Sequence, residues 1–215
     1  MVPTSPKPIP PALVGKRAAN KADKLRRITS AARELFVSNG FDGTTMRGIA
    51  ARAGVGFGTI FDYASNKRDL LFLICNPELE EVLDRSGSHA ATQNRFIDRM
   101  MALFGAYYRY YAQTPTLSRI MLRELTFFTD GEEARKFVTH RARFMSLVSD
   151  HVSECVADGQ LSAANTDLVT RLVFGLYAWE VRRWLADETL NVDRGLAELA
   201  QLIEIQIEGF APRSA

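Results

Sequence analysis

Length, composition and charge exclude several classes of protein. The chain has 215 residues, of which 47% are hydrophobic and 24% are charged, as in ordinary soluble globular proteins. The longest apolar runs, residues 70–75 and 172–179, are far too short to span a membrane. Prolines occupy the N-terminus where a signal peptide would have its apolar core, so we expect a cytoplasmic protein without a membrane partner.

The net charge of +2 conceals an uneven distribution. Residues 1–71 contain 12 Lys and Arg against 5 Asp and Glu, whereas residues 72–215 contain 15 against 20. A basic N-terminal third on an acidic remainder indicates a part that binds a polyanion and a part that avoids it. Cys75 and Cys155 lie in helical patterns far apart in the sequence, and we expect both to be buried free thiols.

The first 22 residues predict a disordered tail, because five prolines and few large apolar residues cannot support a core. Its basic residues, among them Lys16, Arg17 and Lys21, leave two interpretations open. The tail is either a solvated extension or an arm that follows the DNA backbone or enters a minor groove.

Four short helices are predicted next. Apolar spacing marks a helix over residues 24–38 that ends at Gly40, and Thr44 and Thr45 are N-cap candidates for a helix starting near Met46. A turn at Gly54 leads to a helix over residues 57–63. A fourth helix begins at Lys67 and should kink or break at Pro77, and residues 86–91 look like a loop.

The remainder predicts helices over residues 92–113, 115–128, 132–157, 166–187 and 193–210, the last one capped by Asp193. The total is about nine helices, and no β-hairpin signal interrupts them. The expected fold class is therefore all-α. We divide the chain into the tail (1–22), a three-helix head (23–66) and a helical body (67–215).

The last two helices, 166–187 and 193–210, are apolar over too wide an arc for a helix that is buried on one side only. Either both lie in the centre of the body, or they also face a second copy of the chain. We favour a homodimer, because antiparallel helix pairs readily form a two-fold symmetric four-helix interface.

The stretch from 44 to 67 has the spacing of a helix-turn-helix. Ile49, Ala50 and Ala53 form a narrow apolar stripe, and Gly54 follows where a left-handed backbone is needed. The small Ala50 permits a close helix crossing. Helix pairs joined by glycine also occur in proteins that never contact DNA, so spacing alone leaves both interpretations open.

With this order of elements, residues 24–74 resemble the TetR family of bacterial transcriptional regulators. The matching positions are residues 31–36, 40–41, 44–47, 49–50, 53–55, 58–61 and 66–67. The resemblance implies a homodimer that binds a palindromic double-stranded DNA operator, usually acts as a repressor, and is released by a small-molecule inducer. The remaining two thirds matches the family only in outline.

We expect the DNA contacts to come from the helix-turn-helix. Arg47 matches a family position that can reach guanine edges or phosphates, and Lys67 matches the family's phosphate-clamping lysine. Threonines at a helix N-terminus can help to hold a phosphate, and Phe57 can contact a thymine methyl group. The candidate DNA-binding residues are Thr44, Thr45, Arg47, Phe57, Gly58, Thr59, Phe61, Tyr63 and Lys67.

The chain departs from the family pattern in this region. Gly56 replaces the usual Ser or Thr cap, and Phe61 replaces a tyrosine whose hydroxyl would bond a phosphate. Asp62 is acidic where the groove is negative, and Ala64 replaces a common aromatic residue. Operator sequence therefore cannot be carried over from relatives.

Aromatic residues and methionines crowd the body, which suits a hydrophobic or aromatic effector, although plain core packing accounts for many of them individually. The candidate effector-binding residues are Phe104, Tyr107, Tyr108, Tyr111, Met121, His140, Phe144, Phe174 and Tyr177. His140 and His151 lie about 16 Å apart on one helix, too far to share a metal ion.

The sequence predicts no metal site, no cofactor and no enzyme, because it contains no phosphate-binding glycine loop and no nucleophile motif. Two rival functions stay open. The protein is either a constitutive regulator with a solid body, or a helical carrier or enzyme whose basic head is incidental.

Overall fold

The computed structural model describes residues 11–125, 130–162 and 165–208, and for residues 11–16 and 207–208 it describes the backbone alone. The described residues form nine helices and no strand, which confirms the all-α prediction. In chain order they are α1 (Pro11–Gly43), α2 (Met46–Ala53), the 3₁₀-helix η1 (Phe57–Asp62), α3 (Lys67–Ala90), α4 (Phe96–Gln113), α5 (Pro115–Glu124), α6 (Glu132–Ala157), α7 (Thr166–Ala186) and α8 (Val192–Glu208).

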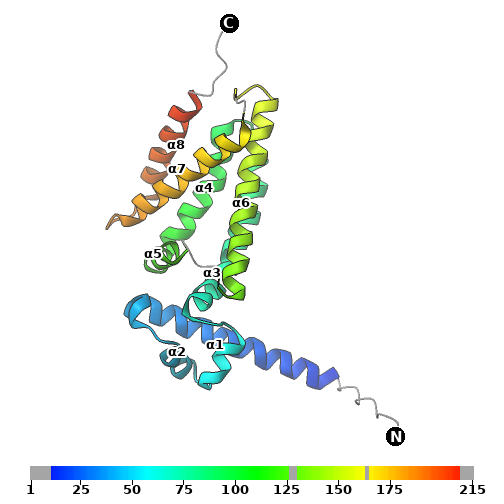
Figure 1. The fold of residues 1–215 in the computed structure, drawn as a ribbon, viewed down its shortest axis with the longest axis vertical. Helices are drawn as coiled ribbons and strands as arrows, with labels where there is room; N and C mark the ends of the chain where they lie inside the picture. The colour runs from blue at the N-terminus through cyan, green and yellow to red at the C-terminus, as the bar shows by residue number, and fades with distance from the viewer. Residues whose placement is uncertain (1–10, 126–129, 163–164, 209–215) are drawn as a thin grey trace.

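The molecule has two parts joined by α3 (Figure 1). The head consists of α1, α2 and η1, with α2 and η1 on the side of α1 that faces away from the body. In the body α3 packs against α4 and α6, α6 packs against α7, and α8 lies against α4 and α7. Because α3 starts beside the head and runs into the body, it is the mechanical link between them.

Helix α1 starts earlier than its sequence pattern suggested. It begins at Pro11 rather than near Lys24, so residues 11–22, expected in a disordered tail, are helical; residues 1–10 lie outside the described part. A proline is tolerated in the first turn of a helix, where its missing N–H has no partner to lose, and the alanines, lysines and leucine that follow favour helix. Near its C-terminus the helix is interrupted at Gly40, whose φ of 71° agrees with the expected left-handed residue.

Local contacts fix the small α2 helix. The Thr45 hydroxyl accepts a hydrogen bond from the Gly48 N–H, and Gly54 ends the helix in the left-handed region at φ 64°. The Arg27 guanidinium donates to the carbonyls of Ala53 and Gly54 at 2.5 and 2.6 Å. The backbone angle at Gly54 favours glycine, and a Cβ there would also displace this guanidinium, which would lie 2.6 Å from it.

Two predictions about α3 were wrong. The helix neither breaks at Pro77 nor ends before residue 86, and it continues to Ala90. Its buried side contacts both α4 and α6, and this packing outweighs the hydrogen bond that Pro77 removes. Ser86 and Gly87 belong to the packed helix: the Ser86 hydroxyl donates to the Leu83 carbonyl, and Gly87 lies against Leu147.

The other boundaries differ by a few residues. Helix α4 begins at Phe96 rather than at residue 92, and α5 has ended by Leu125; residues 126–129, expected in that helix, lie outside the described part. The cap of α8 is Asn191 instead of Asp193, because the Asn191 side chain accepts from the Arg194 N–H at 2.9 Å. Helix α6 has the predicted bounds.

Both cysteines are buried and free, as expected. Burial raises the pKa of the Cys75 thiol to about 12, so it stays protonated at neutral pH and behaves as a small apolar side chain. Among the described residues no helix has the length and apolar character to cross a membrane.

Candidate DNA-reading head and effector cavity

The outer face of the head displays two phenylalanine rings and an arginine. Phe57 and Phe61 are 43% and 47% exposed, and their ring centroids lie 5.2 Å apart in an edge-to-face arrangement. The exposed Arg47 places its guanidinium carbon 5.0 Å from the centre of the Phe57 ring. An arginine fork above an aromatic pair thus occupies the surface formed by α2 and η1.

The two candidate threonines lie in different environments. Thr45 is exposed and caps α2, whereas Thr44 is only 2% exposed and donates its hydroxyl hydrogen bond to the carbonyls of Leu35 and Gly40. The Thr44 N–H is also occupied, by the Phe41 carbonyl. Thr44 therefore holds the α1–α2 corner together, and the exposed N-terminus of α2 belongs to Thr45.

The remaining η1 candidates are arranged along one short helix. Gly58 is exposed with open space where a Cβ would lie, and Thr59 is half-buried. The Tyr63 hydroxyl donates to the Lys21 carbonyl at 3.2 Å, so it ties η1 to the N-terminal part of α1. Gly56 provides no side-chain cap, and the helix is of the tighter 3₁₀ type rather than the expected α-helix.

Lys67 lies under the head. Its ammonium donates to the carbonyls of Phe41 at 2.5 Å and Thr44 at 2.9 Å, and it lies 4.4 Å from the centre of the Phe41 ring. These contacts bind the first residue of α3 to the corner before α2. Lys67 therefore fixes how the head sits on α3, a role that the sequence pattern did not predict.

Asp69 joins the end of the head to the start of α6. One carboxylate oxygen accepts from the Ser65 N–H and hydroxyl, and the other accepts from the N–H groups of Glu133 and Ala134. The side chain is only 2% exposed and caps the N-terminus of α6, which is otherwise uncapped by a side chain. The Asp69 side chain fits in this position because residue 131 is glycine. A Cβ at residue 131 would lie 2.2 Å from the Asp69 carboxylate.

Three ion pairs connect other elements around this joint. Arg33 of α1 pairs with Glu78 of α3 at 2.5 Å, and Arg123 of α5 pairs with Asp42 near the end of α1 at 3.2 Å. Within the body, Arg68 of α3 pairs with Glu124 of α5 at 2.6 Å. Two of these pairs link head and body, so their relative position is set by side chains as well as by the α3 backbone.

The body contains a cavity of about 190 Å³ between α3, α4, α5, α6 and α7. Six of the nine candidate effector residues line it: Tyr107, Tyr111, His140, Phe144, Phe174 and Tyr177. The tyrosine ring of residue 107 stacks on Phe144 with centroids 4.4 Å apart, and these rings form a flat wall. The volume of the cavity is comparable to that of the roughly 150 Å³ apolar cavity known to hold benzene.

The other three candidates are buried but do not line the cavity. Phe104 stacks on Tyr177 at 4.4 Å, Tyr108 packs on Trp184 at 4.7 Å, and Met121 is 1% exposed. The candidate set also missed eight lining residues, of which only Phe137 is aromatic: Leu79, Leu122, Leu125, Phe137, Arg141, Ala178, Val181 and Arg182.

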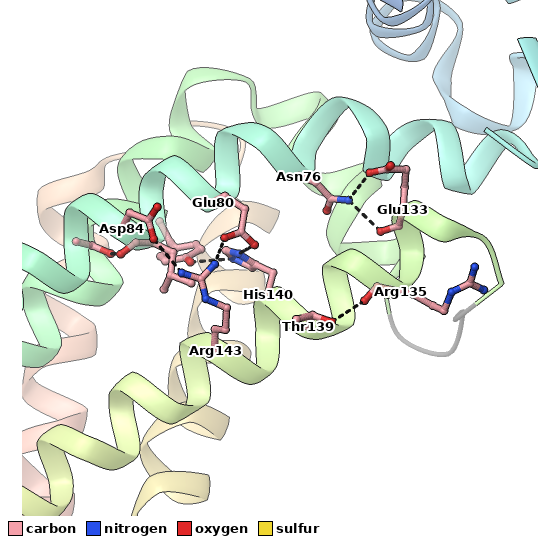
Figure 2. A network of polar contacts seen from close by, with 11 residues as sticks. Asn76, Glu80, Asp84, Glu133, Arg135, Thr139, His140 and Arg143 are labelled. Atoms are coloured by element: carbon pink, nitrogen blue, oxygen red, sulfur yellow. Dashed lines mark hydrogen bonds and ion pairs between the residues drawn. The ribbon is translucent and has the colours of Figure 1, made fainter. Parts of the chain in front are cut away.

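A polar seam runs from the cavity wall along α3 and α6 (Figure 2). The Tyr107 hydroxyl lies 3.0 Å from Nε2 of His140, and Nδ1 of His140 lies 3.1 Å from Glu80. Glu80 also pairs with Arg143, which reaches Asp84 at 3.0 Å. We use the name α3–α6 seam for these five residues.

Burial dominates the ionisation of the inner pair. It lowers the pKa of His140, although the neighbouring Glu80 acts in the opposite direction, and it raises the pKa of Tyr107 above its usual range. The imidazole is therefore neutral at pH 7, and the tyrosine keeps its proton. In the consistent arrangement Tyr107 donates to Nε2 and Nδ1–H donates to Glu80.

Arginines line part of the cavity and of the groove that adjoins it. Arg141 and Arg182 line the cavity, and Leu122 and Arg182 are shared with an adjoining groove of about 450 Å³ that also contains Arg119 and Arg123. Among the described residues, none that lines the cavity or the groove carries a carboxylate. Three arginines share the groove with Leu122, Leu185 and Ala186, and one of them, Arg123, also pairs with Asp42 and Glu124. An aromatic chamber next to such a groove suits a ligand with an apolar end and an anionic end.

An apolar stripe on α7 has no cover within the described chain. Leu168 and Leu172 are each 50% exposed and Trp179 is 68% exposed, at the spacing of one helical face. Gly175 lies in the same stripe, with nothing within 4 Å of where a Cβ would stand. Ile205 of α8 is 62% exposed.

The parts of the chain that the structure describes form no metal site. They contain no group of three His, Cys, Asp or Glu residues that could hold a metal ion. His140 serves the seam, and His151 contacts Arg99 and Glu154 at the other end of α6. Both histidines thus have structural partners.

Comparison with known proteins agrees with this architecture. Residues 28–74 match the family described as bacterial regulatory proteins, tetR family, and residues 93–188 match the tetracyclin repressor-like C-terminal domain. Among curated proteins, the fatty acid metabolism regulator protein of Bacillus subtilis (strain 168) is 21% identical over 170 residues, covering 78% of this chain and 87% of the relative.

Solved structures show the same fold at low sequence identity. The FadR regulator of Bacillus subtilis in complex with stearoyl-CoA has a TM-score of 0.69 and 20% identity, covering 86% of this chain and 98% of its own. The fatty acid degradation regulator FadR of Bacillus halodurans has a TM-score of 0.66 and 22% identity, covering 83% and 96%. With both its head and its body matched, the chain belongs to the TetR family and is a DNA-binding transcriptional regulator.

Proposed function

We propose that the protein is a dimeric repressor that leaves a palindromic operator when an acyl-coenzyme A thioester enters the body. The observation that carries the effector class is the aromatic cavity beside a groove lined by arginines and no carboxylate. An acyl group fits the aromatic cavity, and the phosphates of coenzyme A fit the groove with its arginines. The Bacillus subtilis relative solved with stearoyl-CoA supports this class of ligand.

The cavity volume favours a small acyl group. About 190 Å³ is close to the space that benzene occupies in an apolar protein cavity, and an 18-carbon stearoyl chain needs considerably more. The stacked rings of Tyr107 and Phe144 close one wall. We therefore assign a short or aromatic acyl group to this protein, packed against these stacked rings.

The dimer places the α7 stripe and α8 against the same surfaces of a second copy. Burial of Leu168, Leu172 and Trp179 removes the largest exposed apolar area of the described body from water. The open space at Gly175 permits close approach of a partner helix. Two heads held in this way contact successive major grooves of a palindrome.

In each head, Thr45, Arg47 and the η1 residues face the DNA, with Gly58 allowing close approach of the backbone. Arg47 has an unobstructed fork for guanine or phosphate. Thr44 and Lys67 act from beneath by holding the corner that presents α2, and Tyr63 by tying η1 to α1. The basic residues of the α1 extension add sequence-independent attraction to phosphates.

Effector binding reaches the head through α6 and α3. Helix α6 carries His140, Arg141 and Phe144 at the cavity and is capped by Asp69 of α3 at its N-terminus. A ligand that displaces α6 therefore acts on α3 at both Asp69 and the α3–α6 seam. Since Lys67 fixes the head to α3, the two heads move away from the spacing of the operator.

The test combines ligand binding with operator release. Phenylacetyl-CoA and hexanoyl-CoA should raise the melting temperature and release a fluorescent operator at lower concentrations than stearoyl-CoA. Ala178→Leu, which fills the cavity, should abolish both effects and leave operator binding intact. Arg182→Ala should weaken binding of the thioesters about tenfold. Arg135→Ala should leave this binding unchanged, because Arg135, on the same helix as Arg141, projects away from the seam (Figure 2).

Two results would reject parts of this proposal. If no thioester changes the melting temperature, acyl-coenzyme A thioesters are not the effector class. If stearoyl-CoA acts at the lowest concentration, the cavity volume does not set the acyl group.

A further inference from the structure

We propose that the exposed rings of Phe57 and Phe61 select the operator by packing against the 5-methyl groups of thymines in the major groove. The inference rests on DNA binding by the head and goes beyond it by naming the bases that this head requires. Most DNA-reading side chains recognise polar base edges, so a pair of apolar rings has one natural target there.

The ring pair is unusual within this molecule. The large hydrophobic side chains exposed in the described residues include three aromatic ones, of which Trp179 lies in the α7 stripe and the other two form this pair. Each of the two side chains leaves almost half of its surface in water. Their mutual edge-to-face contact and the Arg47 guanidinium above Phe57 hold the rings in a defined position.

The surroundings of the pair favour DNA over an apolar protein partner. The exposed Arg17, Lys21 and Lys24 lie on the N-terminal part of α1, which the Tyr63 hydroxyl ties to η1 at Lys21. Cations that flank an apolar pair match a duplex, whose phosphates border the groove in which the methyl groups lie. An apolar protein surface offers no counterpart for these charges.

The chemistry of the groove specifies the base. In the major groove adenine, guanine and cytosine present hydrogen-bond donors and acceptors, and thymine adds a methyl group beside its acceptor. Phe57 and Phe61 have no hydrogen-bonding group, and Asp62, which follows Phe61, repels phosphate. Contact with thymine methyl groups is therefore the arrangement that removes both rings from water without leaving a polar base edge unpaired.

The experiment begins with selection of binding duplexes from a random pool by the full chain. In the selected duplex each thymine is then replaced singly by deoxyuridine, which removes only the methyl group. Wild-type protein should lose about fourfold in affinity at one or two thymines of each half-site, as expected for burial of one methyl group, and less than 1.5-fold elsewhere.

Variants then connect the methyl groups to the rings. Phe57→Ala and Phe61→Ala should bind the thymine duplex more weakly and lose discrimination at the sensitive positions. Phe61→Tyr keeps the ring and should keep the discrimination. Val138→Ala removes an exposed apolar side chain from α6 and should change neither affinity nor discrimination.

The possible outcomes distinguish thymine-methyl recognition from DNA binding by the head. Failure to enrich any duplex would overturn both. A selected duplex that binds equally well with uracil at every position would overturn methyl recognition alone, as would equal losses for Phe57→Ala on thymine and uracil duplexes. The latter result would assign the rings to wedging between base pairs.

Discussion

In the head, the side chains that shape the reading surface bond mainly to backbone groups, whereas in the body the polar groups at the cavity bond to one another. Arg27, Thr44 and Lys67 all donate to main-chain carbonyls at helix ends. Tyr107, His140 and Glu80 form a chain of side chains from three helices. The first arrangement fixes a shape, and the second can be rearranged by a ligand.

This difference agrees with the two tasks. A surface that must match DNA benefits from bonds that leave its backbone little freedom. A sensor needs an element with two arrangements whose balance a ligand can change. Asp69 connects the head to the body, because its carboxylate accepts from Ser65 on the head side and from two backbone N–H groups of α6.

The largest expected effect tests whether the two heads work as a pair. Trp179→Glu places a charge in the α7 stripe, so it should give a monomer and reduce operator affinity at least 100-fold, because binding at two half-sites is no longer linked. Light scattering gives the mass, and fluorescence anisotropy gives the affinity. Val138→Glu, at another exposed apolar position, should remain dimeric; a dimeric Trp179→Glu would contradict the proposed interface.

The second prediction separates shape from contact within the head. Lys67→Ala should lower the free energy of unfolding by about 1–3 kcal/mol and operator affinity about tenfold, because two carbonyls lose a charged donor. Arg47→Ala should lower affinity by a similar factor and leave unfolding unchanged, since it makes its contacts on the surface. Urea denaturation and gel shifts distinguish the two. Equal stability of both variants would refute the role of Lys67.

The same contrast explains what could be predicted from sequence. Caps, a left-handed glycine and tight apolar stripes are local patterns, and so Thr45, Gly54 and the helix order were predictable. The position of Lys67 under Phe41 depends on how α3 meets the head, which no short pattern records. Residues 11–22 were misassigned because prolines suggested a tail, although a proline at a helix start is harmless.

In the body, residue type indicated an aromatic interior but not which side chains border empty space. Phe104, Tyr108 and Met121 have the same composition signal as Tyr107 and Phe144, yet they are buried without lining the cavity. Leu79 and Ala178 border the cavity with no signal at all. The continuous α3 shows a related limit: burial against two helices outweighs one proline, and burial is a property of the assembled fold.

The third prediction disconnects the body from the head. Glu80→Ala removes the middle of the α3–α6 seam, so effector and operator should each bind within about threefold of wild type. The factor by which effector weakens operator binding should fall about fivefold, because this factor is the coupling between the sites. Titration of operator complexes with and without hexanoyl-CoA measures it. Glu81→Ala, at an exposed neighbouring carboxylate of α3, is the control and should couple normally.

The smallest effect tests whether the seam is held by a neutral imidazole. Burial lowers the pKa of His140 below its unfolded value of about 6.5, so the unfolded chain binds a proton more readily than the folded one. The free energy of unfolding should therefore decrease as pH falls from 7 towards 5, by up to about 1 kcal/mol more than in His140→Gln. The exposed His89→Gln should keep the wild-type pH dependence. A protonated His140 can no longer accept from Tyr107, so the same window should weaken effector binding. If His140→Gln keeps the wild-type pH dependence of the free energy of unfolding, other groups cause that dependence. The neutral imidazole of His140 would then not hold the α3–α6 seam.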